Sequence, residues 1–421
     1  MANSDHLASI EQGVEVWNSW YKKHPKTIPD LSQANLSNLD LKGINLRRAI
    51  LTQANLSNTD LSKANLTNAN LTKSNLLGAN LEQTNLKGAN LDFAILFKAL
   101  VDRHTLMANK HLQVHKIVNH QGKDRNFAGI DLSNSNLFRA DLSDAELSNV
   151  KLTNANLSKA NLSNAYLYKA NLSGANLENA DLRNAYFSQA DLSNAYLGKA
   201  LCCGTYFKDA DLSFANLRSA KLSHKTMIDL KWYSVWEIVN HGAAKKNLSG
   251  ADLSNANLQD VDFEEANLTN AKLSNAILRR SNLNKANLTN TDLAGANVCG
   301  VDFDRANLKG AKLKSIVSDR HTHLSAVGSA SSKSNVMVQE RPVDESVSTQ
   351  TQSSLAEKSQ TIEPERATEI SQKSDTNWLG VFLLGLVLAT AGIFWIQNSD
   401  GRWSPKLQTW RGQLEELMPQ K

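Results

Sequence analysis

Residues 155–200 read ANLSK-ANLSN-AYLYK-ANLSG-ANLEN-ADLRN-AYFSQ-ADLSN-AYLGK-A, a five-residue unit that repeats without a slip. Each unit has Leu at its centre, Ala two residues earlier, and usually Asn or Asp between them. In a helix, a Leu at every fifth position would rotate steadily around the axis. In a strand, it would alternate between the two faces. Neither regular element would bury one constant side.

A chain that turns a corner after every unit does bury one side. The central Leu and the Ala two residues before it then point inward, and the other three residues point outward. Ala suits the inward corner because a larger side chain would overfill a narrow core. Successive coils of such a chain can pair their backbones at a spacing of about 4.8 Å.

The repeat forms three arrays, and a period this regular organises the whole fold. Array 1 covers residues 30–100, array 2 covers 127–222 and array 3 covers 248–316. Their central residues number 14, 20 and 14, running from Leu31 to Leu96, from Phe127 to Leu222 and from Leu248 to Leu313. Two inserts, 101–126 and 223–247, interrupt the register.

These runs of Ala-(Asn/Asp)-Leu-X-X resemble the pentapeptide-repeat proteins, over roughly two thirds of the chain. The resemblance implies an all-β solenoid, a right-handed quadrilateral β-helix with four units per coil, in which residues 20 apart stack. The spacing of the phenylalanines at central positions supports the 20-residue stride without reference to the family. Phe127, Phe187 and Phe207 differ by multiples of 20, and Phe263 and Phe303 differ by 40.

Three outward tyrosines follow the same stride, and we single them out as a candidate interaction surface. Tyr166, Tyr186 and Tyr206 lie 20 residues apart, on the side of the coil that holds Phe187 and Phe207. Exposed aromatic residues are enriched at protein interfaces. The alternative is a ladder that stacks on itself and stabilises the coils.

Residues 1–29 predict a helix that caps the first coil. Ser4 or Asp5 can cap its start and Pro25 can stop it. Apolar residues at a spacing of three and four share one face: Leu7, Ile10, Val14, Trp17 and Tyr21. The first coil of a solenoid has an unpaired apolar end, and covering that end prevents edge association.

The two inserts are copies of each other, offset by 121 residues, so that Ile117-Val118-Asn119-His120 matches Ile238-Val239-Asn240-His241. Each copy predicts a short amphipathic helix, with His111, Val114, His115 and Val118 on the face of the first and Trp232, Val235, Trp236 and Val239 on the face of the second. A third copy begins at Asp319-Arg320-His321-Thr322, which repeats Asp102-Arg103-His104-Thr105. Ser-rich sequence follows it, so we expect the array to stop there.

His111 and His115 are four residues apart on the first predicted helix, with His104 and His120 nearby, which is a spacing that metal sites use. The internal copy favours another interpretation. His111 aligns with Trp232 and His115 with Trp236, so both positions select a large ring that packs on the solenoid. No Cys or acidic partner lies at ligand spacing, and we expect no metal.

The C-terminal region predicts a membrane tether. Residues 317–377 form a linker, and from 325 onward it is rich in Ser, Gln, Glu and Thr with no apolar period, as in disordered chains. Residues 378–396 carry no charge and are long enough to span about 28 Å of hydrocarbon. Trp378 and Trp395 would anchor the two interfaces. Gly385 and Ala389 form a small-residue pair that predicts weak homo-association.

The tail, residues 397–421, predicts a short amphipathic helix on the membrane surface, with an apolar stripe of Leu407, Trp410, Leu414 and Leu417. Topology signals disagree. Basic residues after the span outnumber those before it by one, which favours a cytoplasmic tail. The lack of an N-terminal signal in this sequence favours a cytoplasmic β-helix, and we give it more weight. Long arrays with this N-terminal helix and insert resemble cyanobacterial pentapeptide proteins, which implies the plasma or thylakoid membrane.

Composition excludes several functions. The formal net charge is +5 and no basic run is present, so we expect no nucleic-acid partner. Cys202, Cys203 and Cys299 make no disulfide framework. No catalytic set or phosphate loop is present, so we expect neither an enzyme nor a cofactor. Interiors filled by Leu and Ala also disfavour a small-molecule carrier.

Two hypotheses remain. The first is a membrane-tethered scaffold that binds a protein partner which the sequence does not name. The second is a topoisomerase-binding DNA mimic, like the quinolone-resistance members of the family. Mimicry requires an acidic rod, but residues 30–100, 127–222 and 248–313 together hold 23 basic and 22 acidic residues, so we favour the scaffold.

Overall fold

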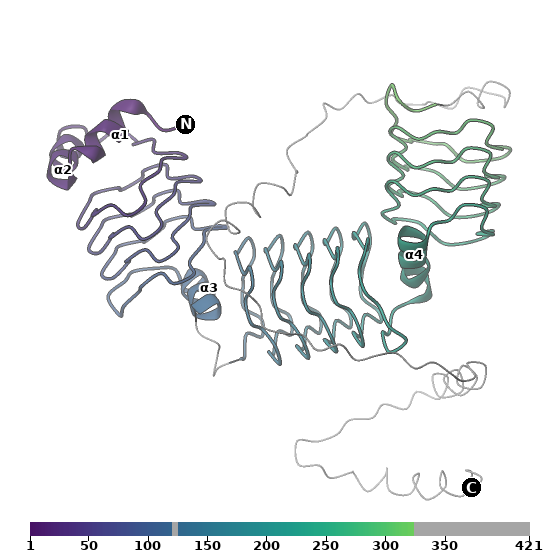
Figure 1. Cartoon of the computed structure of the whole chain (residues 1–421), viewed down its shortest axis with the longest axis horizontal. Helices are drawn as coiled ribbons and strands as arrows, with labels where there is room; N and C mark the ends of the chain where they lie inside the picture. Colours follow the sequence, from purple (N-terminus) through teal and green to yellow (C-terminus); the bar gives the residue numbers. More distant parts are fainter. Residues whose placement is uncertain (120–124, 324–421) are drawn as a thin grey trace, which may run out of the picture. The chain divides into compact units, whose positions relative to one another are not determined.

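The computed structural model describes residues 1–119 and 125–323. Within these residues the helices are α1 (Ser4–Glu11), α2 (Val14–Lys23), α3 (Asn109–Asn119) and α4 (Leu230–His241). Most of the remaining chain forms coils joined by isolated parallel bridges. Figure 1 shows each array as its own stack of coils, with α3 and α4 at array ends.

Stacking follows a stride of 20 residues, which confirms four units per coil. In array 2, Asn156 bridges Asn176 in parallel. The amide of Leu157 donates to the carbonyl of Asn176 at 2.8 Å, and the amide of Asn156 donates to Ser135 in the preceding coil at 2.9 Å. The central residues and the alanines that precede them are buried, and they form one continuous core. Phe187 and Phe207 stack inside it with their ring centroids 5.3 Å apart.

Every unit ends in a tight turn. In the unit centred on Leu157, the amide of Ala160 donates to the carbonyl of Leu157 at 3.0 Å. Lys159, the third turn residue, has φ 59°, and a positive φ at this place is typical of type II turns. Only glycine adopts this region freely, and asparagine is the next best suited. The many Asn and Gly residues two places after the central Leu are explained by this conformation.

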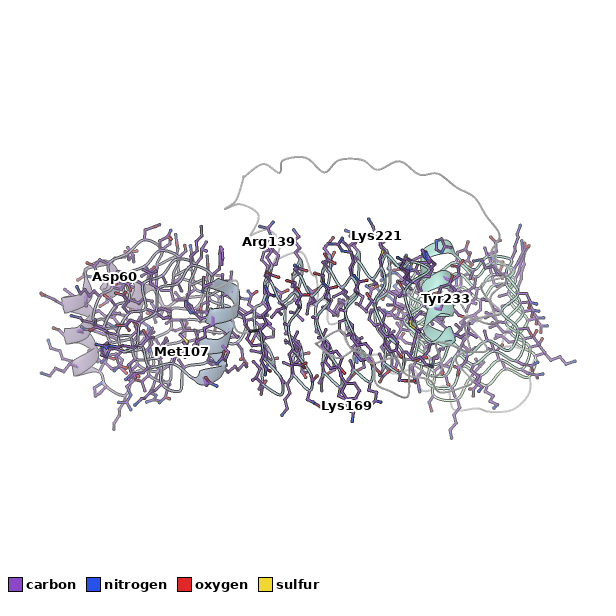
Figure 2. The ribbon with its side chains drawn as sticks, turned by 90° about the horizontal axis from the view of Figure 1, so that it is seen from below. Asp60, Met107, Arg139, Lys169, Lys221 and Tyr233 are labelled. Atoms are coloured by element: carbon purple, nitrogen blue, oxygen red, sulfur yellow. The ribbon has the colours of Figure 1, made fainter. Side chains whose placement is uncertain are left out.

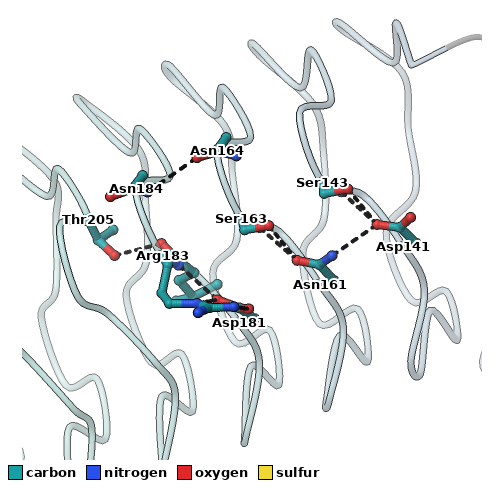
Figure 3. A network of polar contacts seen from close by, with 10 residues as sticks. Asp141, Ser143, Asn161, Ser163, Asn164, Asp181, Arg183, Asn184 and Thr205 are labelled. Carbon is teal, nitrogen blue, oxygen red and sulfur yellow. Dashed lines mark hydrogen bonds and ion pairs between the residues drawn. The ribbon is translucent and has the colours of Figure 1, made fainter. Parts of the chain in front are cut away.

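The Asn or Asp before each central residue stabilises the same turn. The side-chain Oδ1 of Asn156 accepts hydrogen bonds from the amide and the hydroxyl of Ser158, at 3.2 and 2.7 Å. Figure 3 shows the same arrangement for Ser143 on Asp141, and for a second pair in the next coil. Asn and Asp side chains commonly hold turns in this way. The recurrence of these residues therefore reflects turn formation.

The N-terminal cap consists of two helices, which corrects the single helix predicted over residues 1–29. Gly13 has φ 106° and separates α1 from α2. Asn3 caps α1, because its Oδ1 accepts from the amides of Asp5 and His6, so the predicted caps Ser4 and Asp5 are wrong. The predicted apolar face is present. Ile10, Trp17 and Tyr21 are buried, while Leu7 and Val14 pack against the core and are partly buried.

The predicted insert boundaries are also corrected. Leu106 bridges Asn85 and Met227 bridges Tyr206, each across 21 residues, so the arrays extend one longer unit into both inserts. Array 3 begins earlier than predicted, at Ala243, whose amide donates to Asp262 at 3.1 Å. Ala243 occupies a central position that elsewhere holds Leu, which is why the pattern did not reveal it.

The predicted C-terminal elements lie outside the described residues. They comprise most of the linker, the apolar segment 378–396 with its anchors Trp378 and Trp395, the pair Gly385 and Ala389, and the tail. Among residues 1–119 and 125–323, no helix has the length and apolar character needed to cross a membrane.

Candidate functional site

The three predicted tyrosines form one column on the outside of array 2. Tyr166 bridges Tyr186, which bridges Tyr206. Their ring centroids are 5.0 and 4.7 Å apart and their planes differ by 11° and 18°. The ring faces therefore contact each other, as in the ladder interpretation. Tyr166 remains 41% exposed, so the column also presents aromatic surface to solvent.

The column continues beyond the three rings. The ring of Tyr168 stacks on Tyr166 at 6.3 Å, and the ammonium of Lys169 lies 5.2 Å from the Tyr168 centroid. Figure 2 shows Lys169 pointing away from the coils. Partial burial raises the pKa of Tyr166 and of Tyr206 above the usual value for tyrosine. A tyrosine hydroxyl is protonated at neutral pH in any case, so both can donate hydrogen bonds.

Tyrosine at this position has a structural cost. Elsewhere the residue before the central Leu is usually Asn or Asp, whose side chain accepts the amide two residues later. A Tyr side chain cannot reach back to that amide, so the three tyrosines give up three turn-stabilising bonds of about 1 kcal/mol each. Ring stacking offsets part of this loss, since an aromatic pair contributes about 0.5–1.5 kcal/mol.

The histidines considered as metal ligands pack against the end of array 1. His111 and His115 are 8% and 4% exposed. The ring Nε2 of His115 lies 2.8 Å from the carbonyl oxygen of Ala99, so it must be the protonated nitrogen. Trp236, its counterpart in α4, donates its indole N–H to Ala220 at the same distance. Over residues 1–119 and 125–323, no three His, Cys, Asp or Glu side chains gather as a metal site would require.

An asparagine at the same place in both inserts, which the sequence interpretation missed, binds the last coil of the array before it. Asn119 Oδ1 accepts from the amide of Lys98 at 2.5 Å, and its Nδ2 donates to the carbonyl of Leu96 at 2.9 Å. Asn240 makes the same pair of bonds to the amide of Ser219 and the carbonyl of Leu217, at 2.5 and 3.1 Å. The signal was available, because Asn stands in both copies of Ile-Val-Asn-His.

The helix α2 covers the first edge with similar chemistry. Trp17 donates its indole N–H to the carbonyl of Asn45 at 2.7 Å. Asn18 accepts from the amide of Asn45 at 2.8 Å and donates to the carbonyl of Gly43 at 3.1 Å. The helices α2, α3 and α4 thus each cover a different coil edge. Each uses one ring N–H and one side-chain amide to bond backbone groups that are free at that edge.

Consecutive arrays also bond directly. The amide of Phe93 donates to the carbonyl of Asn134, and the amide of Phe214 donates to the carbonyl of Asn255, both at 2.7 Å. Both donors are bulky residues with φ 60°, a conformation that such residues rarely adopt. Within residues 1–119 and 125–323, the phenylalanines with a positive φ are Phe93 and Phe214, one at each joint.

Several solved structures resemble this chain. HetL, a pentapeptide-repeat protein involved in heterocyst differentiation regulation from the cyanobacterium Nostoc sp. strain PCC 7120, is 27% identical over 70% of this chain and 91% of its own, with a TM-score of 0.17. A pentapeptide-repeat protein from the Arabidopsis thaliana thylakoid lumen is 28% identical over 27% of this chain and 76% of its own, with a TM-score of 0.17. Full-length QnrB1, a plasmid-mediated fluoroquinolone resistance protein, is 14% identical over 68% of this chain and 95% of its own, with a TM-score of 0.19.

Family membership rests on the repeat itself. No curated protein matches the sequence. The family described as pentapeptide repeats matches in eight copies, which lie within residues 30–100, 124–223 and 247–316. These ranges cover the same coils that stack at the 20-residue stride. The chain therefore belongs to the pentapeptide-repeat family, whose fold is the right-handed quadrilateral β-helix.

Proposed function

We propose that this protein is a non-enzymatic scaffold whose β-helix binds a protein partner through its outer faces. The observation that carries the proposal is the tyrosine column, where Tyr166, Tyr186 and Tyr206 replace turn-forming Asn or Asp residues with aromatic surface. Interfaces are enriched in Tyr, and a rigid column loses little conformational entropy on binding. The coils supply rigidity because their central side chains are buried in one core.

Affinity capture with a column variant tests this function. The triple change of Tyr166, Tyr186 and Tyr206 to Asn restores the residue type of the neighbouring columns. We expect the coils to stay folded, because Asn at this position bonds the turn amide two residues later. We expect the triple variant to lose the partners that the unaltered chain captures from membranes. Tyr196→Asn is the matched control, because Tyr196 is an exposed tyrosine in another column. Equal capture by the triple variant would sink the role of the column.

We further propose that the apolar segment 378–396 tethers the β-helix to a membrane, with the array on the cytoplasmic side. The support is sequence alone: a run of 19 uncharged residues with Trp near both ends. Fractionation should recover the full chain with membranes in the presence of alkaline carbonate. Protease added to sealed inside-out vesicles should digest the array if it faces the cytoplasm, and should spare it in sealed right-side-out vesicles. Recovery in the soluble fraction would contradict the tether.

The DNA-mimic alternative rests on family resemblance. The balanced charge of the arrays removes the electrostatic basis for replacing DNA. Inhibition of gyrase supercoiling by the full chain, at a ratio of a few molecules per enzyme, would favour this alternative over the scaffold.

A further inference from the structure

Three coil edges in this chain are covered by a helix of the same chemical type. The helices α2, α3 and α4 each contribute a ring N–H and an asparagine amide to free backbone groups. In α3 and α4 the two residues stand four apart, as His115 and Asn119 and as Trp236 and Asn240. The last coil of array 3 is a fourth edge, and it can be compared position by position.

Three threonines fix that comparison. Each array has a threonine near the end of its longer last unit, and its hydroxyl donates to a backbone carbonyl in the coil before. These threonines are Thr105, Thr226 and Thr322. Counting back nine residues from each gives Leu96, Leu217 and Leu313. The last coil of array 3, residues 304–323, therefore has the same construction as residues 87–106 and 208–227.

The fourth edge keeps the equivalent backbone acceptors and donor, but within residues 1–119 and 125–323 no helix covers them. The groups that the α4 side chains bind on array 2 are the amide of Ser219 and the carbonyls of Leu217 and Ala220. Their equivalents are the amide of Ser315 and the carbonyls of Leu313 and Ile316. Among the described residues none of these three groups is hydrogen-bonded.

The apolar side chains of this edge are also less buried than those of the two edges that α3 and α4 cover. Leu96 and Leu217 are buried under α3 and α4, whereas Leu308 and Leu313 are only partly buried. Half-buried leucines beside unbonded backbone groups are what a coil edge presents before a helix covers it.

The chain's own sequence after residue 323 does not supply this helix type. The positions equivalent to Trp236 and Asn240 are Ser332 and Val336. Residues 324–421 contain no His, and none of their four Trp residues is followed by Asn one or four places later. A second copy offers no complementary charge, because its edge would present the same exposed lysines, Lys309, Lys312 and Lys314.

We propose that the edge formed by residues 304–323 docks an amphipathic helix of another protein. This helix carries Trp or His four residues before Asn, and acidic residues on its flank. The acidic flank follows from Lys309 and Lys314, which are exposed and make no ion pair among the described residues. The inference rests on the proposed scaffold function and names the kind of partner.

The sequence of α4 provides a probe, since it already binds an edge of this kind. A helix-stabilised peptide of residues 229–242 is added to the full chain, and amide hydrogen exchange is followed by mass spectrometry. We expect the peptide to slow exchange within residues 304–323 at least tenfold. Residues 87–106 and 208–227, whose edges are covered, should not change. A peptide with Trp236→Phe and Asn240→Ala should have no effect.

A variant of the edge completes the test. Leu313→Glu should abolish the response to the peptide, and unchanged exchange in residues 284–303 would show that the coil beneath is intact. The proposal is overturned if millimolar peptide leaves residues 304–323 unprotected. It is equally overturned if residues 304–323 already exchange as slowly as residues 208–227 when no peptide is added. Slow exchange at every protein concentration would show that a segment of the same chain covers the edge. Slow exchange only at high protein concentration would show that a second copy covers it. Each of these failures leaves the capture result for the tyrosine column unaffected.

Discussion

At the scale of single residues, each of the five positions answers a different physical demand. The central Leu fills the core, the Ala before it fits the inner corner, and the Asn or Asp between them holds the next turn. The inner corner also accepts small hydroxyl side chains. Thr84, Thr205 and Ser281 stand where Ala is usual, and each donates its hydroxyl to a carbonyl in the preceding coil, at 2.7–2.8 Å.

Ser74 and Ser135 occupy the same inner corner and are buried, but neither hydroxyl has a hydrogen-bond partner among the residues that the structure describes. We expect Ser74→Ala to stabilise the protein by about 1 kcal/mol, because it removes an unsatisfied buried hydroxyl. Ser281→Ala is the matched control and should destabilise by about 1 kcal/mol, because it removes a formed bond. Urea unfolding measures both changes. A loss of stability in Ser74→Ala would contradict the assignment.

Asp181 offers a second test at this scale. Hydrogen bonds from the Arg183 side chain, the closest at 2.6 Å, lower the pKa of this carboxyl. A lowered folded pKa gives stability that is present above the unfolded value of about 3.9 and is lost as the pH falls through the folded value. Asn at this position would keep the turn bond to the Arg183 amide, which the carboxylate accepts at 3.1 Å.

We therefore expect Asp181→Asn to be slightly less stable than the unaltered protein at pH 7, by under about 1 kcal/mol because Arg183 is exposed. The difference should shrink as the pH falls through the lowered folded pKa and disappear once the carboxyl is protonated in both states. Urea unfolding at pH 7 and at a series of acidic pH values measures it. Asp191→Asn is the control, since Asp191 accepts the Ser193 amide and has no ion pair among the described residues. A difference that persists at low pH would contradict the prediction.

At the scale of elements, the sequence predicted the features that arise from the repeat. It missed the features that depend on a single residue that departs from the repeat. The stride of 20, the buried phenylalanines and the helical inserts all follow from repeated residues. The division of the N-terminal cap depends on Gly13 alone, and the early start of array 3 depends on Ala243, where the Leu signal is absent. Asn119 and Asn240 looked like ordinary helix residues because their partners lie in another element.

The two insert helices differ in their expected response to pH. Burial lowers the pKa of His111, which favours the neutral ring in the folded state at neutral pH. The unfolded chain takes up a proton below its ordinary pKa of about 6.5, so stability is complete above that pH and declines as the pH falls below it. We expect His111→Trp, the residue of the other copy, to remove this decline.

The reverse change provides the control. Trp232→His should introduce a loss of stability between pH 7.5 and 5.5 at the α4 edge. Thermal unfolding at the two pH values measures both variants. An unchanged pH profile in both would show that these rings do not titrate with folding.

At the scale of the whole described chain, three arrays are linked by two joints of one design. Stability in such repeat proteins is approximately a sum of unit terms and nearest-neighbour terms. At each joint the neighbour terms include one backbone bond, from Phe93 or Phe214, and the contacts of one helix. These few contacts decide whether adjacent arrays unfold together.

Weakening one joint should uncouple the arrays that it links. We expect the double variant Trp236→Ala and Asn240→Ala to raise exchange rates in the last coil of array 2 and to leave array 1 unchanged. His115→Ala with Asn119→Ala should do the same to the last coil of array 1. Amide exchange by mass spectrometry, with peptides from each array, measures the effect. Uniform acceleration across all three arrays would show that they form one cooperative unit.

The 20-residue stride also turns residue number into an address. Within an array, the remainder after division by 20 names the side of the coil, and the quotient names the height in steps of about 4.8 Å. The stride lengthens to 21 residues in the coils that end at Leu106, Met227 and His323, so the count holds only within one array. A row of chosen side chains at molecular spacing could therefore be written directly into the sequence, as the row of tyrosines in array 2 already is.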